Sequence, residues 1–239
     1  MKTFYAALAV VALLGAVALA FVSQGSRTSV VTLDPELAAA PMAAGYVMGD
    51  QHTAKVEIVE FGDFECIGCG AWFDMTEHEV KEKLVKPGIA TFRFYDFPLQ
   101  QIHPHALSAH VAAGCAAAQN KFWEMHDRLY TGQSEWNAQG TNNPKKVFQG
   151  YVKAIGVDMR EWNKCYDERR PLPQILANQK EGERLRVSAT PTLRIGNKMI
   201  TGNDLSFDRV KVYVDSALAD TLGRVKPPPP GSASGRGGK

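Results

Sequence analysis

The sequence predicts an α/β domain that begins with a β-α-β unit, continues through a block of helices and ends with a β-β-α unit. Three observations lead to this fold class. One helix lies between two strand-like segments near the start, a long central region shows only helical periodicity, and two short apolar segments flank a Gly-Asn turn before a last helix. With 45% hydrophobic and 22% charged residues, the chain can form one sizeable core.

The first unit is defined by its apolar pattern. Residues 55–61 are expected to form a strand, and a helix follows over residues 66–86 because its apolar positions have helical spacing. Pro87 and Gly88 end that helix, and residues 89–96 form the second strand. A strand, a helix and a second strand in this order predict a parallel β-α-β unit.

The helical insertion is expected over residues about 103–187. Strands then return at 192–195 and 198–200, and the last helix runs from Ser206, a plausible N-cap, to Leu222. The helices predicted within the insertion are 105–118, 120–131, 144–155, 159–168 and 172–186.

The ends of the chain differ in composition from residues 50–222. Residues 4–22 carry no charge and follow Lys2, which indicates a signal peptide or an uncleaved membrane anchor over residues 1–22. An A-x-A sequence would allow cleavage near Ala20. We expect a linker over 23–49 and a disordered Pro/Gly-rich tail over 223–239. The net charge of +2 gives no indication of nucleic-acid binding.

Two of the four cysteines form a C-x-x-C motif, Cys66-Ile-Gly-Cys69, at the start of the first helix. Unpaired backbone N–H groups and the helix dipole stabilise a thiolate at that position, so Cys66 is the candidate nucleophile. Cys69 is close enough in sequence to close a disulfide with it. A zinc knuckle uses the same spacing, but the motif's place between a strand and a helix favours redox chemistry, and we predict no metal site.

Several separated segments resemble the DsbA-like thioredoxin-fold thiol–disulfide oxidoreductases. They are the run 59–69 around the cysteines, Asp-Phe-Pro-Leu at 96–99 with His-Pro-His-Ala at 103–106, Lys-Phe-Trp-Glu-Met-His at 121–126 and Val-Ser-Ala-Thr-Pro-Thr at 187–192. The resemblance covers residues 50–222. It implies a thioredoxin fold with an inserted helical subdomain, in agreement with the order of elements predicted above.

The resemblance also implies roles for individual residues. Thr190-Pro191 is expected to be a cis peptide bond that faces the two sulfurs and, with Ile67 and Gly68, binds substrate backbone. Glu60 falls where the family places a buried acid behind the second cysteine, so it is expected to accept the proton of Cys69.

The dipeptide between the cysteines departs from the family pattern. The strong oxidants of the family carry a histidine there, whereas this chain has Ile67-Gly68, and Asp63 and Glu65 add negative charge nearby. Both differences oppose thiolate formation, so we expect a redox pair that is less oxidising than the strongest family members.

The other two cysteines, Cys115 and Cys165, lie in predicted helices of the insertion. Some relatives have a disulfide at comparable places, which implies a structural disulfide here. Two inert buried thiols and a pair that passes electrons to the C-x-x-C remain as alternatives.

The expected function is a protein disulfide oxidoreductase of the periplasm or cell envelope. It would form or exchange disulfides in exported proteins without a cofactor, and a membrane redox partner would recycle Cys66 and Cys69. The alternatives are a disulfide reductase or isomerase, a copper metallochaperone that uses the same cysteines, and a non-catalytic binding module.

Overall fold

The computed structural model describes residues 28–202 and 204–224, together with residues 11 and 13. The predicted signal peptide or anchor of residues 1–22 therefore lies outside the described residues except at two positions. The predicted tail is described only as far as residue 224, where the last helix ends.

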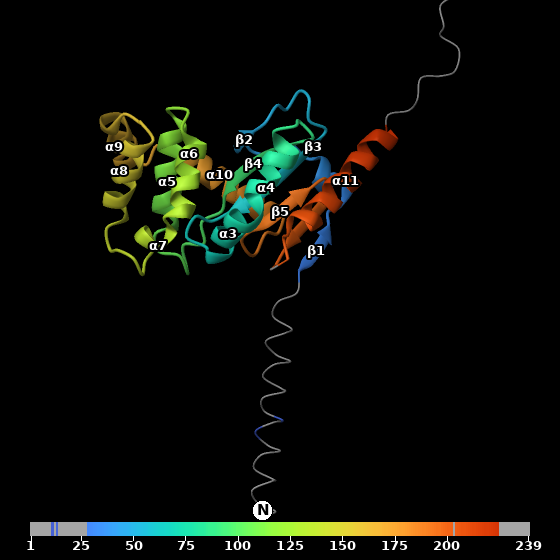
Figure 1. Cartoon of the computed structure of the whole chain (residues 1–239), viewed down its shortest axis with the longest axis horizontal. Helices are drawn as coiled ribbons and strands as arrows, with labels where there is room; N and C mark the ends of the chain where they lie inside the picture. The colour runs from blue at the N-terminus through green and yellow to red at the C-terminus, as the bar shows by residue number, and fades with distance from the viewer. Residues whose placement is uncertain (1–10, 12, 14–27, 203, 225–239) are drawn as a thin grey trace, which may run out of the picture.

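A mixed six-stranded sheet in the order β1-β6-β5-β3-β4-β2 forms the centre of the molecule (Figure 1). Its strands are β1 (Ser29–Thr32), β2 (Tyr46–Met48), β3 (Val56–Gly62), β4 (Ala90–Asp96), β5 (Thr192–Ile195) and β6 (Lys198–Thr201). β3 and β4 are parallel, and every other neighbouring pair is antiparallel. The predicted β-α-β and β-β-α units share this sheet, which confirms the predicted fold class.

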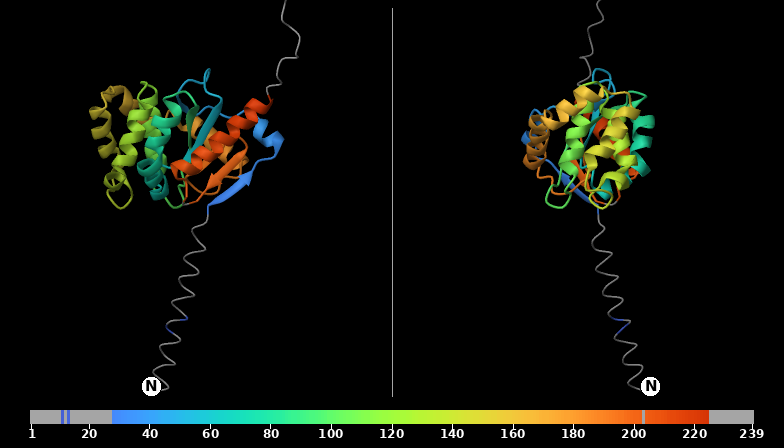
Figure 2. Two further views of the ribbon diagram at one scale, coloured as in Figure 1. Left: turned by 45° about the vertical axis from the view of Figure 1, so that its right-hand side comes forward. Right: turned by 90° about the vertical axis from the view of Figure 1, so that its left-hand side faces the viewer.

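The helix after β3 is continuous over residues 67–85 but changes its winding. It consists of α3 (Ile67–Trp72), η1 (Phe73–Glu77), α4 (His78–Val80) and η2 (Lys81–Val85), of which η1 and η2 are π-helical. Trp72, Val80 and Leu84 pack on one face of the sheet beside Val210 and Val214 of α11 (Phe207–Arg224). Figure 2 shows α11 crossing that face.

The helices between β4 and β5 form most of the insertion, which stands at the β2–β4 end of the sheet (Figures 1 and 2). Phe94 of β4 and Phe64 join the core of the insertion, so the two parts share apolar contacts. The inserted helices are α5 (Ala106–Ala117), α6 (Phe122–Thr131), α7 (Gln133–Trp136), α8 (Pro144–Ala154), α9 (Met159–Asp167) and α10 (Leu172–Arg184).

The predicted linker of residues 23–49 is wrong for residues 29–32, 35–39 and 46–48, which form regular elements. β1 pairs with β6 and β2 pairs with β4, so these segments form both edges of the sheet, with α2 (Pro35–Ala39) between them. These elements have only three to five residues each. Such short segments show no sustained periodicity, and their stability comes from pairing with strands that are distant in sequence.

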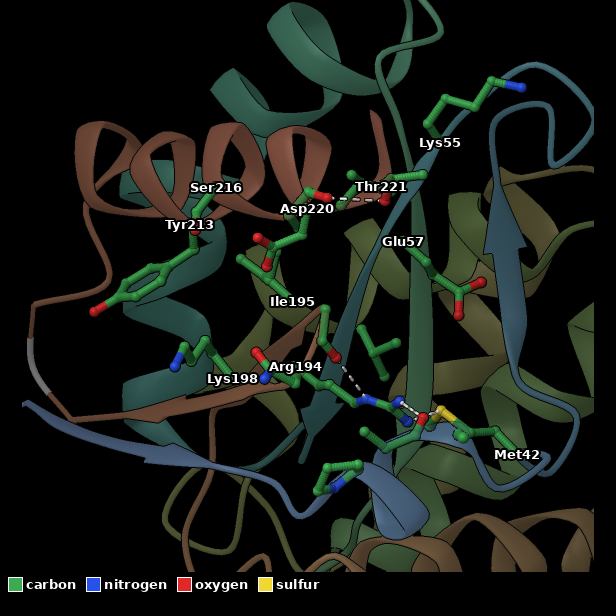
Figure 3. A pocket seen from close by; sticks show the side chains of 18 residues that line it. Met42, Lys55, Glu57, Arg194, Ile195, Lys198, Tyr213, Ser216, Asp220 and Thr221 are labelled. Atoms are coloured by element: carbon green, nitrogen blue, oxygen red, sulfur yellow. Dashed lines mark hydrogen bonds between the residues drawn. The ribbon is translucent and has the colours of Figure 1, made fainter. Parts of the chain in front are cut away.

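A cavity of about 400 Å³ lies between the N-terminal segment, the start of β3 and α11 (Figure 3). Arg194 extends along it and donates hydrogen bonds to the carbonyl oxygen of Ala38 and to the sulfur of Met42. These contacts attach the segment that contains α2 to β5.

Candidate functional site

The two cysteines of the C-x-x-C motif lie where β3 passes into the first helix. A short loop, 63–65, follows β3, and Cys66 is the N-cap residue with an extended backbone, φ −70° and ψ 122°. Ile67 is the first helical residue, and the amide of Gly70 donates to the carbonyl of Cys66 at 3.1 Å. The Cys66 sulfur therefore stands beside the unpaired N–H groups of a helix start.

The two sulfurs have opposite environments. Cys66 is half-buried, and the hydrogen bond from the Cys69 thiol is the largest effect lowering the pKa of Cys66 to about 6; burial opposes it, and Thr190 makes a smaller contribution in the same direction. Cys69 is fully buried, and that burial raises its pKa. The lowered pKa of Cys66 favours a thiolate at the half-buried sulfur, and the raised pKa of Cys69 favours a protonated thiol at the buried one.

The segment that leads into β5 lies opposite these sulfurs. Thr190-Pro191 is a cis peptide bond, and the Cys66 thiol donates to the carbonyl oxygen of Thr190 at 3.3 Å. A Cβ added to Gly68 would lie 3.4 Å from Cδ of Pro191 and 3.6 Å from Sγ of Cys66. Glycine therefore keeps the space between the motif and the proline open.

A groove of about 810 Å³ begins at Gly68, Thr190 and Pro191 and continues between the first helix and the start of α11. Trp72 and Phe207 line it, and Met75, which is 71% exposed, borders it. Ile67 at the mouth of the motif is 78% exposed. The groove offers apolar surface next to the reactive sulfur.

Glu60 lies behind Cys69 in the middle of the sheet. β3 is paired on both sides, and Glu60 stands between Phe94 of β4 and Leu193 of β5. Its side chain is fully buried, and neither carboxylate oxygen has a hydrogen-bond partner among the described residues. Burial, followed by the charge of Glu77, raises the pKa of Glu60 well above its ordinary value. This rise favours the protonated form of Glu60.

The loop carboxylates Asp63 and Glu65 are buried and hydrogen-bonded, which the sequence did not indicate. Asp63 accepts hydrogen bonds from the amides of Glu65 and Leu99, both at 2.8 Å, and pairs with Nδ1 of His103 at 2.7 Å. Glu65 accepts from the amides of His105 and Ala138. These contacts fix the loop that carries Cys66.

His103 is a titratable group near Cys66, although the dipeptide of the motif contains no histidine. The hydrogen bond to Asp63 raises the pKa of His103, and the charges of Asp63 and Cys66 add to the rise. Because this attraction is mutual, protonation of His103 favours the Cys66 thiolate and opposes the effect of the Asp63 charge, which raises the pKa of Cys66.

His103→Asn is therefore expected to raise the pKa of Cys66 by less than about one unit. The thiolate absorbance of Cys66, followed against pH, measures this shift, and His52→Asn, at an exposed histidine, serves as the control.

The same variant should change how stability depends on pH. A histidine with a raised pKa contributes stability below its unfolded pKa, and this stability is lost as pH rises through the folded pKa. The loss of stability in the variant should accordingly be largest in acid and vanish at alkaline pH. An unchanged Cys66 pKa would show that His103 only fixes the loop.

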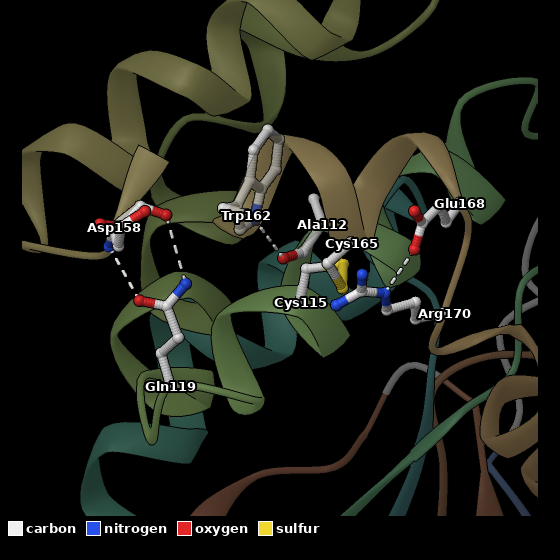
Figure 4. The surroundings of a disulfide bond; sticks show 8 residues. All are labelled: Ala112, Cys115, Gln119, Asp158, Trp162, Cys165, Glu168 and Arg170. Carbon is white, nitrogen blue, oxygen red and sulfur yellow. Dashed lines mark hydrogen bonds and ion pairs between the residues drawn. A yellow bond between two sulfur atoms is a disulfide. The ribbon is translucent and has the colours of Figure 1, made fainter. Parts of the chain in front are cut away.

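Cys115 of α5 and Cys165 of α9 form a disulfide (Figure 4). Beside it, the indole of Trp162 donates to the carbonyl of Ala112 at 3.1 Å, so α9 is attached to α5 by a covalent bond and a hydrogen bond. The disulfide belongs to the core of the insertion.

A second group of buried polar residues was not found from the sequence. Glu77 of η1 and His126 of α6 approach Glu60, and Lys81 of η2 and Asp127 of α6 border them. Glu77 follows Cys69 by about two helical turns and precedes Lys81 by four residues, and this spacing on one helix face is the signal in the sequence that could have identified the cluster.

Within the part of the chain that the structure describes, none of the helices has the length and apolar character needed to span a membrane.

The fold and the site define a thioredoxin-fold protein with a C-x-x-C motif at a helix start and a cis-proline opposite it. A family model described as Thioredoxin matches residues 43–216, and the chain belongs to that family, with the DsbA-like fold. Among solved structures, α-DsbA1 of Wolbachia pipientis superposes with a TM-score of 0.66 at 16% identity, covering 79% of this chain and 98% of that one. BdbD of Bacillus subtilis gives 0.65 at 18%, covering 75% and 98%.

Curated relatives include two different kinds of protein. The Na(+)/H(+) antiporter NhaA 1 of Salinispora arenicola is 31% identical over 210 residues, which are 88% of this chain and 29% of the antiporter. The chain thus spans less than a third of the antiporters that it matches. A probable disulfide bond formation protein D of Bacillus anthracis is 22% identical over 165 residues, 69% of this chain and 75% of that protein.

Proposed function

We propose that this chain is an extracytoplasmic thiol–disulfide oxidoreductase that forms or exchanges disulfides in exported proteins through Cys66 and Cys69. The observation that carries the proposal is the asymmetry of the pair, in which Cys66 has a pKa of about 6 and Cys69 is fully buried. Solved structures of similar fold include BdbD in its oxidised form and DsbA proteins, which supports the same reaction class.

The proposed reaction oxidises a substrate dithiol. A substrate thiolate attacks Sγ of Cys66 in the oxidised pair, the Cys66–Cys69 bond breaks, and Cys69 leaves with the electron pair and takes up a proton. A second substrate thiolate attacks the substrate sulfur of the mixed disulfide, and Cys66 leaves as a thiolate. The substrate loses two electrons and the cysteine pair gains them. The two substrate thiols lose two protons in total. Cys69 takes up the equivalent of one of them, and the other is released to solvent.

The proposed reaction gives roles to the remaining site residues. Glu60 supplies the proton to Cys69, and Thr190 and Pro191 present backbone to an extended substrate peptide. Ile67 and the groove beside Gly68 contact apolar side chains of that peptide. A membrane redox partner would use the same surface to reoxidise the pair, since both reactions pass through a mixed disulfide at Cys66.

The acidity of Cys66 favours the direction of electron flow from substrate to enzyme. A stabilised thiolate stabilises the reduced pair, which makes the disulfide more oxidising. A pKa of about 6 lies below the ordinary range of a thiol but above that of the strongest oxidants. We propose a potential inside the range of about −120 to −270 mV that such pairs span.

A glutathione redox titration of the full chain tests the proposal, with the state of each cysteine read by alkylation and mass spectrometry. A Cys66–Cys69 disulfide that equilibrates in the oxidising part of that range supports a disulfide donor. A pair that stays oxidised until conditions are strongly reducing would identify a reductase instead. Cysteines that never pair, or that bind one Cu(I) per chain, would contradict the redox function.

A further inference from the structure

We propose that Glu77 and His126 form, with Glu60, a buried proton path that connects Cys69 to the surface carboxylate of Asp127. The inference rests on the proposed function and names residues that neither the motif nor the fold assigns. Cys69 must gain a proton when the pair is reduced and lose it when the pair is reoxidised. Because Cys69 and Glu60 are both fully buried, that proton needs a route to solvent.

At the interior end of the path, three buried side chains with polar atoms that lack hydrogen-bond partners among the described residues lie close together. One carboxylate oxygen each of Glu60 and Glu77 and one ring nitrogen of His126 all lie within 4.8 Å of one another, and all three side chains are fully buried. Both oxygens of Glu60 and Nε2 of His126 lack a hydrogen-bond partner among the described residues. Such groups are unfavourable in a core unless they share protons.

The outer end leads from His126 to the surface. Nε2 of His126 lies 3.8 Å from Oε2 of Glu77, while Nδ1 is 2.9 Å from Oδ1 of Asp127. The His126 ring is fully buried, whereas the Asp127 side chain is 52% exposed. The His126 ring therefore places Nε2 near the buried carboxylate of Glu77 and Nδ1 within hydrogen-bond distance of the partly exposed carboxylate of Asp127. The longer separations are of the size that one bridging water or a small side-chain rotation closes.

Lys81 supports a proton path and opposes a metal ion at this place. Its ammonium lies 2.5 Å from Oε1 of Glu77 and 3.0 Å from Oδ1 of Asp127. Burial lowers the pKa of Lys81, but these two carboxylates outweigh it and raise the pKa overall, so the cluster already contains a cation. The buried phenol of Tyr130 faces the same acids, and burial raises its pKa, so it remains a proton donor.

The path works in both directions of thiol–disulfide exchange. When Cys69 leaves as a thiolate it takes the proton of Glu60, and Glu60 regains one through Glu77, His126 and Asp127. When Cys69 attacks a mixed disulfide on Cys66, its proton returns to Glu60 and leaves by the same route. No electrons pass through these residues, and one proton crosses for each disulfide made or broken.

The test separates two steps of one reaction. Reduced full-length protein is mixed with oxidised glutathione, and stopped-flow measurements follow the attack of Cys66 on glutathione and then the first-order closure of the disulfide by Cys69. Glu77→Gln and His126→Gln should slow closure by about ten-fold or more and change its pH profile and solvent isotope effect. The attack step should stay within two-fold of wild type. Glu82→Gln, an exposed glutamate of the same helix that pairs with Lys86, is the matched control.

Glu60→Gln distinguishes the two proposals. Slow closure in Glu60→Gln with normal closure in Glu77→Gln and His126→Gln would overturn the path but leave the role of Glu60 intact. Normal closure in Glu60→Gln would contradict both the role of Glu60 as proton donor to Cys69 and the proton path. One divalent metal ion bound per purified chain, and lost in Glu77→Gln, would overturn the path in favour of a metal site.

Discussion

Cys69→Ala is expected to abolish turnover and to trap substrates on the enzyme. The variant keeps the Cys66 thiol, with the helix start and Thr190 beside it, so Cys66 still attacks a disulfide and forms a mixed disulfide. Without Cys69 nothing within the chain can release the substrate. The measurement is the yield of covalent Cys66–glutathione adduct after mixing with oxidised glutathione, read by mass spectrometry.

Cys66→Ala is the matched variant because it keeps the other cysteine. Cys69 is fully buried and burial raises its pKa, so this variant should form essentially no adduct under the same conditions. Equal adduct yields in the two variants would mean that both sulfurs are accessible, and the assignment of Cys66 as the nucleophile would fail. The Cys69→Ala variant should also react more slowly than wild type, since the hydrogen bond that contributes most to lowering the pKa of Cys66 is lost.

The elements that the sequence predicted have their determining interactions close together in the chain. β3, the first helix and β4 show their own apolar periods, and the C-x-x-C motif consists of four consecutive residues at one helix start. The Gly196-Asn197 turn indicated that β5 and β6 are adjacent, and these strands are paired. Local patterns of this kind predicted the α/β fold class before any tertiary contact was known.

The features that were missed depend on tertiary pairing. β1 and β2 have four and three residues and are strands only because β6 and β4 offer open edges. The partner of Asp63 is His103, forty residues away, so the sequence suggested a destabilising charge where the structure has a hydrogen-bonded pair. Glu77 and His126 come from different helices, and only the packing of α6 against the first helix brings them to Glu60.

These differences change the view of the redox pair. From the sequence, the absence of a histidine in the dipeptide and the presence of two acids both argued for a weak thiolate. The structure buries both acids in hydrogen bonds and adds His103, while the neighbouring Cys69 thiol contributes most to lowering the pKa of Cys66. An intermediate oxidant is therefore consistent with a motif that lacks its own cation.

Removing the disulfide of the insertion, as Cys115→Ala with Cys165→Ala, is expected to lower the free energy of unfolding by about 4 kcal/mol. The bond closes a loop with a sequence separation of 50, and its loss enlarges the unfolded ensemble. Both cysteines lie in the apolar core that also contains Phe64 and Cys69, so the effect should reach the whole domain. Urea unfolding without reductant measures it.

The pair Cys66→Ala with Cys69→Ala is the control for this measurement, because it retains the disulfide of the insertion and removes the redox pair. If Cys115 and Cys165 were inert buried thiols, their removal would forfeit only the packing of two small side chains, about 1 kcal/mol each, and reductant would not change the wild-type midpoint. If they passed electrons to Cys66 and Cys69, their removal would slow reoxidation of the pair without a comparable loss of stability. A loss of about 4 kcal/mol with normal exchange at Cys66 would assign the disulfide to the fold alone.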